Sequence, residues 1–127
     1  MEAFWNQIAL SLMQKSIFNC GRHGCTEWTG GREHGVYGKK SVVWPDGKKK
    51  IERVHRLSYM HAHHIMRDEM PNKNSQGERL DVSHICHNPI CFKPEHLILE
   101  PHSLNMDRMG CRMRNLCTKD HYPHCLL

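Results

Sequence analysis

Residues 81–105 hold the side chains of this sequence that are best suited to metal binding and to catalysis. Three zinc-type ligands in this segment are each separated by four residues, at Cys86, Cys91 and His96. A structural zinc ion takes four thiolate or imidazole ligands in a closed tetrahedron, so this set needs a fourth ligand from elsewhere in the chain. His84 and Asn105 flank the three ligands and remain free for chemistry of their own.

A second group of metal-type ligands lies near the end of the sequence. Four of them fall within fifteen residues, at Cys111, Cys117, His121 and Cys125. His124 is a rival for His121, although its position next to Cys125 would strain joint ligation. This group predicts a second closed zinc site.

The cysteine and histidine content favours metal binding over disulfide formation. The sequence has seven cysteines and twelve histidines, and an odd number of cysteines in close pairs with interleaved histidines is typical of zinc sites. The fourth ligand of the first site is then either Cys20 or Cys25. Reduced cysteines, together with no apparent signal peptide or membrane-spanning segment, predict an intracellular location, nuclear in a eukaryote.

Length and charge narrow the class of protein further. At 127 residues with 7% aromatic residues, the chain is expected to form one small domain, residues 1–127, that two structural zinc ions hold together. The formal net charge of +5 favours a polyanionic partner.

The N-terminal half predicts a helix, a loop and a basic hairpin. Apolar residues recur at helical spacing over residues 2–15, whereas the glycine-rich residues 19–31 predict a loop. Residues 35–44 and 48–53 predict two antiparallel strands joined by a Pro-Asp-Gly turn. Because a two-stranded ribbon fits the major groove of DNA, we expect its cations to bind nucleic acid: Lys39, Lys40, Lys48, Lys49, Lys50 and Arg53.

The C-terminal half predicts a second helix over residues 54–67 and then a ββα unit. The unit consists of strands over residues 80–85 and 97–100 and a helix over residues 103–109. Ser103 is a suitable N-cap for that helix, and Gly110 is expected to end it. His84 is then placed on the first strand and Asn105 in the first turn of the helix.

This unit resembles the His-Cys box of the intron-encoded homing endonucleases, within the His-Me finger (HNH-like) nuclease superfamily. The matching residues are Ser83-His84-x-Cys86-His87-Asn88-x-x-Cys91, then Pro94-x-His96-Leu97, then Asn105. The second ligand group also matches, as do the upstream stretches Cys25-Thr-Glu-Trp-Thr-Gly-Gly and His55-Arg56-Leu57. The resemblance covers roughly residues 25–125.

The resemblance implies a fold and a set of roles. It implies an α+β fold with a ββα-metal nuclease core, to which the basic hairpin and the N-terminal helix are added. His84 would be the general base that activates water, and Asn105 would hold one catalytic Mg²⁺ ion at the scissile phosphate. Both zinc ions would be structural, and Cys25 would complete the first site with Cys86, Cys91 and His96.

Two features differ from the pattern of the family. The family places an arginine near the scissile phosphate, and the candidates here are Lys39, Lys40 or a residue of the 48–53 strand. The best-known member of the family has an arm beyond its second zinc that swaps across a homodimer, whereas only Leu126 and Leu127 follow the last cysteine here. We therefore expect a monomer or a weak homodimer.

The predicted function is that of an Mg²⁺-dependent endonuclease acting on DNA, with a duplex as the expected partner. One alternative is a catalytically inactive, zinc-stabilised DNA-binding module, which would need the zinc ligands and the hairpin but neither His84 nor Asn105. Another is a protein-interaction module, which would leave the basic hairpin without a role.

Overall fold

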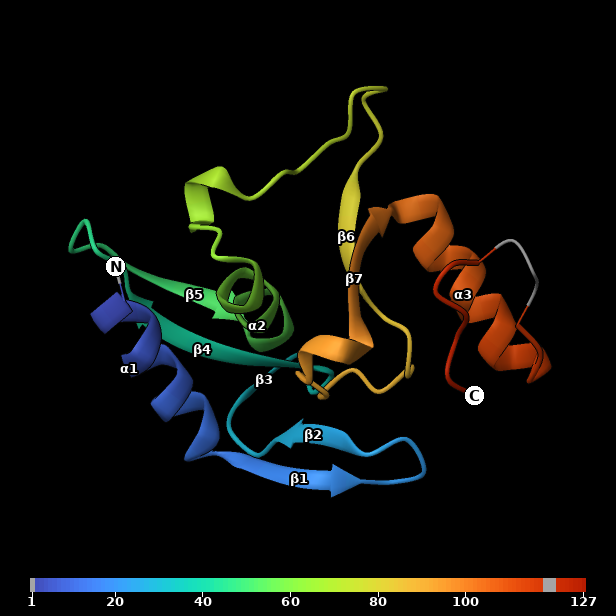
Figure 1. The fold of residues 1–127 in the computed structure, drawn as a ribbon, viewed down its shortest axis with the longest axis horizontal. Coiled ribbons are helices and arrows are strands. Elements are labelled where there is room, and N and C mark those ends of the chain that lie inside the picture. The colour runs from blue at the N-terminus through green and yellow to red at the C-terminus, as the bar shows by residue number, and fades with distance from the viewer. Residues whose placement is uncertain (1, 118–120) are drawn as a thin grey trace.

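The computed structural model of the chain describes residues 2–117 and 121–127. These residues form a small α+β fold, as predicted (Figure 1). The helices are α1 (Glu2–Met13), α2 (Val54–His63) and α3 (His102–Arg114), with short 3₁₀ helices η1 (Arg67–Glu69) and η2 (Pro94–His96). The strands are β1 (Ser16–Cys20), β2 (Cys25–Trp28), β3 (Arg32–Glu33), β4 (Tyr37–Val43), β5 (Lys49–Arg53), β6 (Leu80–His84) and β7 (Leu97–Pro101).

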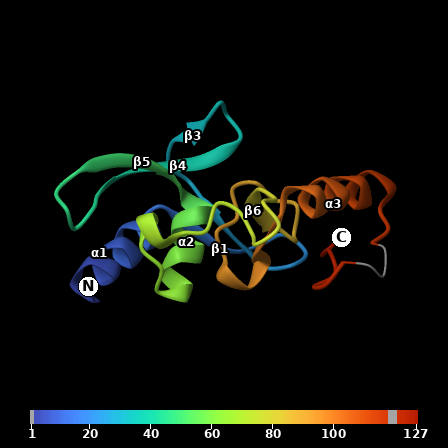
Figure 2. The same ribbon diagram turned by 90° about the horizontal axis from the view of Figure 1, so that it is seen from above.

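The strands form three small sheets rather than one large one. β1 pairs with β2, β4 lies between β3 and β5, and β6 pairs with β7. Figure 2 shows the β3–β4–β5 sheet along one side of α1 and α2, with β6 and α3 towards the other end of the fold. In the described residues no helix is long and apolar enough to cross a membrane.

The core forms around α2, which contacts α1, η2 and the strands β4, β5, β6 and β7. Val54, Leu57 and Met60 of α2 are buried there. The apolar face of α1 adds Trp5, Ile8 and Leu12 to the same core. The predicted N-terminal helix is therefore confirmed, and it ends at Met13 rather than at residue 15.

Residues 19–31 are not a loop throughout, so that prediction is wrong. β1 ends at Cys20, and Cys25–Trp28 forms β2, which pairs with it. Gly21 and Gly24 lie in the turn between the two strands, where each has a positive φ that favours glycine. β2 is mostly buried and bonds a second segment, because the Trp28 amide donates to the Ile90 carbonyl at 2.9 Å. These tertiary partners stabilise a strand that the glycine content alone does not indicate.

The predicted basic hairpin is confirmed as β4 and β5, with Ser41 opposite Ile51. The helix predicted over residues 54–67 is shorter, because α2 ends at His63. His64 adopts a left-handed conformation (φ 54°), and its amide donates to backbone carbonyls of the last turn. This is a common way for a helix to end, and it turns the chain away from the helix axis.

The predicted ββα unit is present as β6, β7 and α3. The two strands are antiparallel, with His84 opposite Leu97. The helix is longer than predicted, because it starts directly after Pro101 and continues through Gly110 to Arg114. Ser103 therefore lies inside the helix and is not its N-cap. A glycine interior to a helix costs only about 1 kcal/mol, and the buried contacts of Arg108 and Cys111 offset that cost.

Candidate metal centres and nuclease site

The first ligand cluster consists of Cys25, Cys86, Cys91 and His96. The Sγ atoms of Cys25 and Cys91 lie 3.6 and 3.5 Å from Nδ1 of His96. All four ligand atoms lie within 4.8 Å of one another. In a tetrahedral zinc site, bonds of about 2.3 Å to sulfur and 2.0 to 2.1 Å to nitrogen place these atoms about 3.6 Å apart. The donor set and its spacing therefore fit a structural zinc ion.

Strand β2 brings Cys25 to this cluster. Its backbone pairs with the loop between β6 and β7: the Phe92 amide donates to the Thr26 carbonyl at 2.9 Å, and Glu27 forms a β-bridge with Cys91. Cys20, the other candidate for the fourth ligand, lies outside the cluster. Its Sγ instead approaches a backbone carbonyl of its own hairpin, that of Ile17, at 3.3 Å.

The second cluster consists of Cys111, Cys117, His121 and Cys125. The three Sγ atoms lie 3.3, 3.6 and 3.9 Å from Nδ1 of His121 in that order, which again fits tetrahedral zinc. The predicted helix end at Gly110 would place Cys111 after the helix, but Cys111 lies on α3 itself. The rival ligand His124 is exposed and lies outside the cluster. Two Cys₃His clusters in the described residues thus support two structural zinc ions.

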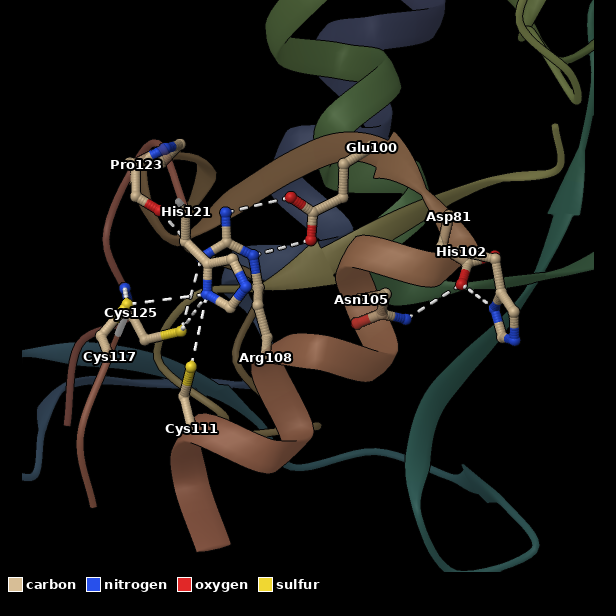
Figure 3. A network of polar contacts seen from close by, with 10 residues as sticks. All are labelled: Asp81, Glu100, His102, Asn105, Arg108, Cys111, Cys117, His121, Pro123 and Cys125. Atoms are coloured by element: carbon tan, nitrogen blue, oxygen red, sulfur yellow. Dashed lines mark hydrogen bonds and ion pairs between the residues drawn. The ribbon is translucent and has the colours of Figure 1, made fainter. Parts of the chain in front are cut away.

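A buried ion pair joins the second cluster to the ββα unit (Figure 3). Arg108 of α3 and Glu100 of β7 are 2% and 4% exposed, and two hydrogen bonds of 2.7 and 3.0 Å join them. Nη1 of Arg108 also donates to the Pro123 carbonyl at 2.8 Å and approaches Sγ of Cys125 at 3.5 Å. A single guanidinium therefore holds α3 to both the strand pair and the C-terminal segment.

His84 lies at the end of β6, and a hydrogen bond fixes the orientation of its ring. Nε2 lies 3.0 Å from the Cys91 carbonyl, which can only accept, so Nε2 carries the proton and Nδ1 carries the lone pair. Burial lowers the pKa of His84 to about 4, because it disfavours the charged imidazolium. The imidazole is therefore neutral, with one ring nitrogen able to accept a proton.

Two further rings surround His84 that sequence analysis did not single out. The ring of His55 lies 4.5 Å from that of His84, and the ring of Tyr37 stacks on it at 6.1 Å. Burial, with the nearby His84, lowers the pKa of His55 well below its usual value, so this ring stays neutral. His55 belongs to the upstream His-Arg-Leu match, and that match was the feature of the sequence that could have placed His55 at the candidate site.

Asn105 lies in the first turns of α3, and its amide is fixed on one side. Nδ2 donates to Oδ2 of Asp81 at 2.9 Å, and no hydrogen bond from the described residues reaches the amide oxygen. Asn105 and His84 line one cleft of about 500 Å³, together with Tyr37 and the exposed side of α3. The two residues predicted to act together thus share a cleft. An amide oxygen without a donor there fits a hard cation such as Mg²⁺.

A second cleft of about 480 Å³ shares Tyr37, Asn105 and Met106 with the first. Its charged lining combines Asp81 with four cations: Arg53, Arg56, Lys73 and Arg79. Of these, sequence analysis proposed only Arg53 as a nucleic-acid contact. Arg56 lies in the upstream match, whereas Lys73 and Arg79 are separated from the ligand pattern by the polar loop. These residues add basic groups beside the candidate site.

The six predicted cations of the β4–β5 hairpin do not share one face. Because side chains alternate along a strand, the register places Lys39 and Arg53 on the face opposite to Lys40. Arg53 is also paired with Glu33 at 3.0 Å, and its guanidinium lies 4.7 Å above the ring of Tyr37. Lys48, Lys49 and Lys50 are exposed at the tip. The tip therefore carries the most accessible charge of the hairpin.

The α+β fold and its two Cys₃His clusters define the chain as a zinc-stabilised protein whose ββα unit contributes ligands to both clusters. The protein family described as the zinc-binding loop region of homing endonuclease matches residues 26–126. Because the match covers most of the chain, the chain belongs to this family. Membership indicates a nuclease-related, DNA-binding function. Searches of curated proteins and of solved structures found no match to the chain.

Proposed function

We propose that the chain is a divalent-metal-dependent endonuclease that hydrolyses phosphodiester bonds in duplex DNA. The observation that carries this proposal is the shared cleft of His84 and Asn105. Their side chains offer an unprotonated ring nitrogen and an amide oxygen that accepts no hydrogen bond from the described residues. Membership in the homing endonuclease family supports it.

His84 acts as the general base. Its Nδ1 accepts a proton from a water molecule as that water attacks the phosphorus atom in line with the departing 3′ oxygen. The Cys91 carbonyl keeps the other nitrogen protonated, so that the lone pair lies on Nδ1 before the proton is transferred. The carbonyl also stabilises the imidazolium that forms, because Nε2–H donates to it in both states.

Asn105 holds the catalytic cation through its amide oxygen. A bound Mg²⁺ supplies Lewis-acid stabilisation of the charge that develops on the phosphate and the leaving oxygen. The amide nitrogen stays on Asp81, so the oxygen is the atom that Asn105 presents to the ion.

The two zinc ions have a structural role in this proposal. Each cluster provides four protein ligands, which leaves no open position for water or substrate. The first zinc would fix the loop whose Cys91 carbonyl orients His84, and the second would fix α3, which carries Asn105.

A plasmid assay tests the proposal. Zinc-loaded protein is incubated with supercoiled plasmid, with and without added Mg²⁺; omission of Mg²⁺ is the better control, because a chelator would also extract zinc. We expect cleavage only with the divalent cation. His84→Ala should lower the rate by about 10² to 10⁴, the usual contribution of a general base, with both zinc ions retained. His63→Ala, at an exposed histidine of α2, is the matched control.

The inactive DNA-binding module is the second candidate, favoured by the exposed lysines at the hairpin tip. It predicts plasmid retardation in a gel without cleavage at any Mg²⁺ concentration. Cleavage by His84→Ala at the parental rate would exclude His84 as the base.

A further inference from the structure

Asp81 is a half-buried carboxylate beside Asn105 that forms no part of either zinc cluster. The side chain is 13% exposed and lies on β6, three residues before His84. Oδ1 accepts from Nε of Arg79 at 3.1 Å. Oδ2 accepts from Nδ2 of Asn105 at 2.9 Å and contacts Nδ1 of His102, as Figure 3 shows. The carboxylate is therefore held from three sides.

The contact between Asp81 and Asn105 decides which end of the amide points away from Asp81. A carboxylate without a proton can only accept hydrogen bonds, so the amide must turn its nitrogen to Asp81 and its oxygen away from it. Figure 3 shows this arrangement, with the nitrogen of Asn105 towards Asp81. The terminal torsion of asparagine is broad and roughly two-fold, so that side-chain geometry alone would not select this orientation.

The charge of Asp81 is maintained by the same contacts. Burial alone would raise its pKa, but the hydrogen bonds from Asn105 and His102, with the nearby Arg79, outweigh burial and lower the pKa. The group therefore remains an acceptor at neutral pH.

We propose that Asp81 is a positioning residue that fixes the Asn105 amide with its oxygen towards the cleft, so that this oxygen is available to a divalent cation. The inference rests on the proposed function of Asn105. Removal of a group that hydrogen-bonds a metal ligand typically lowers metal affinity or activity by about 10- to 100-fold.

A role as a direct ligand fits the contacts less well. Both carboxylate oxygens already accept hydrogen bonds from protein donors, and one of these donors is the amide of the candidate ligand itself. A purely structural role would not depend on the orientation of Asn105.

Three variants separate these roles. Asp81→Ala removes the acceptor, so that the amide can turn its nitrogen to the cleft. Asp81→Asn keeps one acceptor oxygen for Asn105 and His102, while Arg79, which is 69% exposed, can turn to solvent. Asp107→Ala, at an exposed carboxylate of α3, the helix that carries Asn105, is the control for loss of a negative charge.

The first readout is metal binding without catalysis. In zinc-loaded, ¹⁵N-labelled protein, Mn²⁺ should broaden the side-chain amide signal of Asn105, as in the parent, in Asp81→Asn and Asp107→Ala. In Asp81→Ala the broadening should require about 10- to 100-fold more Mn²⁺. The second readout is plasmid cleavage, where the Mg²⁺ concentration for half-maximal rate should rise by the same factor.

The outcomes are distinct. Unchanged Mn²⁺ broadening in Asp81→Ala would overturn the inference, as would loss of zinc from that variant, which would indicate a structural role. An Asp81→Asn variant as defective as Asp81→Ala would point to a direct ligand and would also overturn it. A third outcome separates the two proposals. If the parent shows no cleavage, but Mn²⁺ broadens the Asn105 signal in the parent and in Asp81→Asn and not in Asp81→Ala, the positioning role stands and the nuclease proposal fails. Absence of broadening in the parent overturns the positioning role whatever the activity.

Discussion

At the scale of single residues, one backbone carbonyl determines what His84 can do. The carbonyl belongs to Cys91, which is itself a member of the first ligand cluster. The orientation of the ring therefore depends on the loop that the cluster closes. Loss of the first zinc should therefore affect the orientation of His84, the proposed general base, as well as the stability of the loop.

The identity of the fourth ligand can be tested at the same scale. Cys25→Ser should lower the zinc content from two ions to one, because Cys25 lies within the first cluster. Cys20→Ser should keep both ions, because Cys20 lies outside both clusters and its Sγ approaches backbone carbonyls of its own hairpin. Metal analysis of the purified variants is the measurement. Loss of zinc in Cys20→Ser alone would contradict the assignment.

At the scale of elements, the position of α3 depends on Arg108. Arg108→Met would leave Glu100 charged, buried and without its main partner. Breaking a buried ion pair in this way costs about 3 to 5 kcal/mol. Urea unfolding of the zinc-loaded protein would measure the free energy of unfolding, with Arg114→Met, an exposed arginine of the same helix, as the control. Equal stabilities of the two variants would contradict this role.

The β4–β5 hairpin makes a separate prediction about DNA binding. If four to six phosphates are contacted, the logarithm of the binding constant should fall with the logarithm of salt concentration at a slope of about −4 to −5. Replacing Lys48, Lys49 and Lys50 with alanine should flatten that slope, because these exposed lysines would no longer release counterions. Fluorescence anisotropy with a labelled duplex measures it, and Lys15→Ala serves as a control outside the hairpin. An unchanged slope in the triple variant would place the DNA surface elsewhere.

At the scale of the whole molecule, the packing of α1 affects whether two copies of the chain can form a dimer. Trp5, Ile8 and Leu12 pack into the core around α2, so this face is not free to pair with a second copy. We therefore propose a monomer or weak dimer that cuts one strand at a time. Symmetric double-strand cutting would need two active sites related by a two-fold axis.

This proposal predicts the order of products on supercoiled plasmid. Open circles should accumulate before linear DNA appears, and light scattering should give a mass close to the 14.9 kDa of one chain. Direct conversion to linear DNA by a stable dimer would contradict the proposal. In that case the exposed Met109 and Met113 of α3 would be the first candidates for residues of the dimer interface.

The sequence by itself determined the features whose parts lie close together along the chain. Cys86, Cys91 and His96 are near neighbours in sequence, as are the four ligands after residue 110, so their spacing alone predicts two metal sites. The basic hairpin and the order of the ββα unit follow from strand and turn patterns of similar short range.

Tertiary structure decided the features that depend on distant partners. The residues left the choice between Cys25 and Cys20 open, and only the family resemblance implied Cys25. The structure makes this choice by pairing β2 with a loop that is distant in sequence, through the bridge of Glu27 with Cys91 and the hydrogen bond from Trp28 to Ile90. The length of α3 depends on the contacts of Arg108 with Glu100 and Cys125, which override the local stop signal at Gly110. The partners of His84 and Asn105, at His55 and Asp81, come from other elements. Local patterns report backbone preference over a few residues, whereas strand pairing, helix ends and side-chain orientation are set by packing energies between segments that only folding brings together.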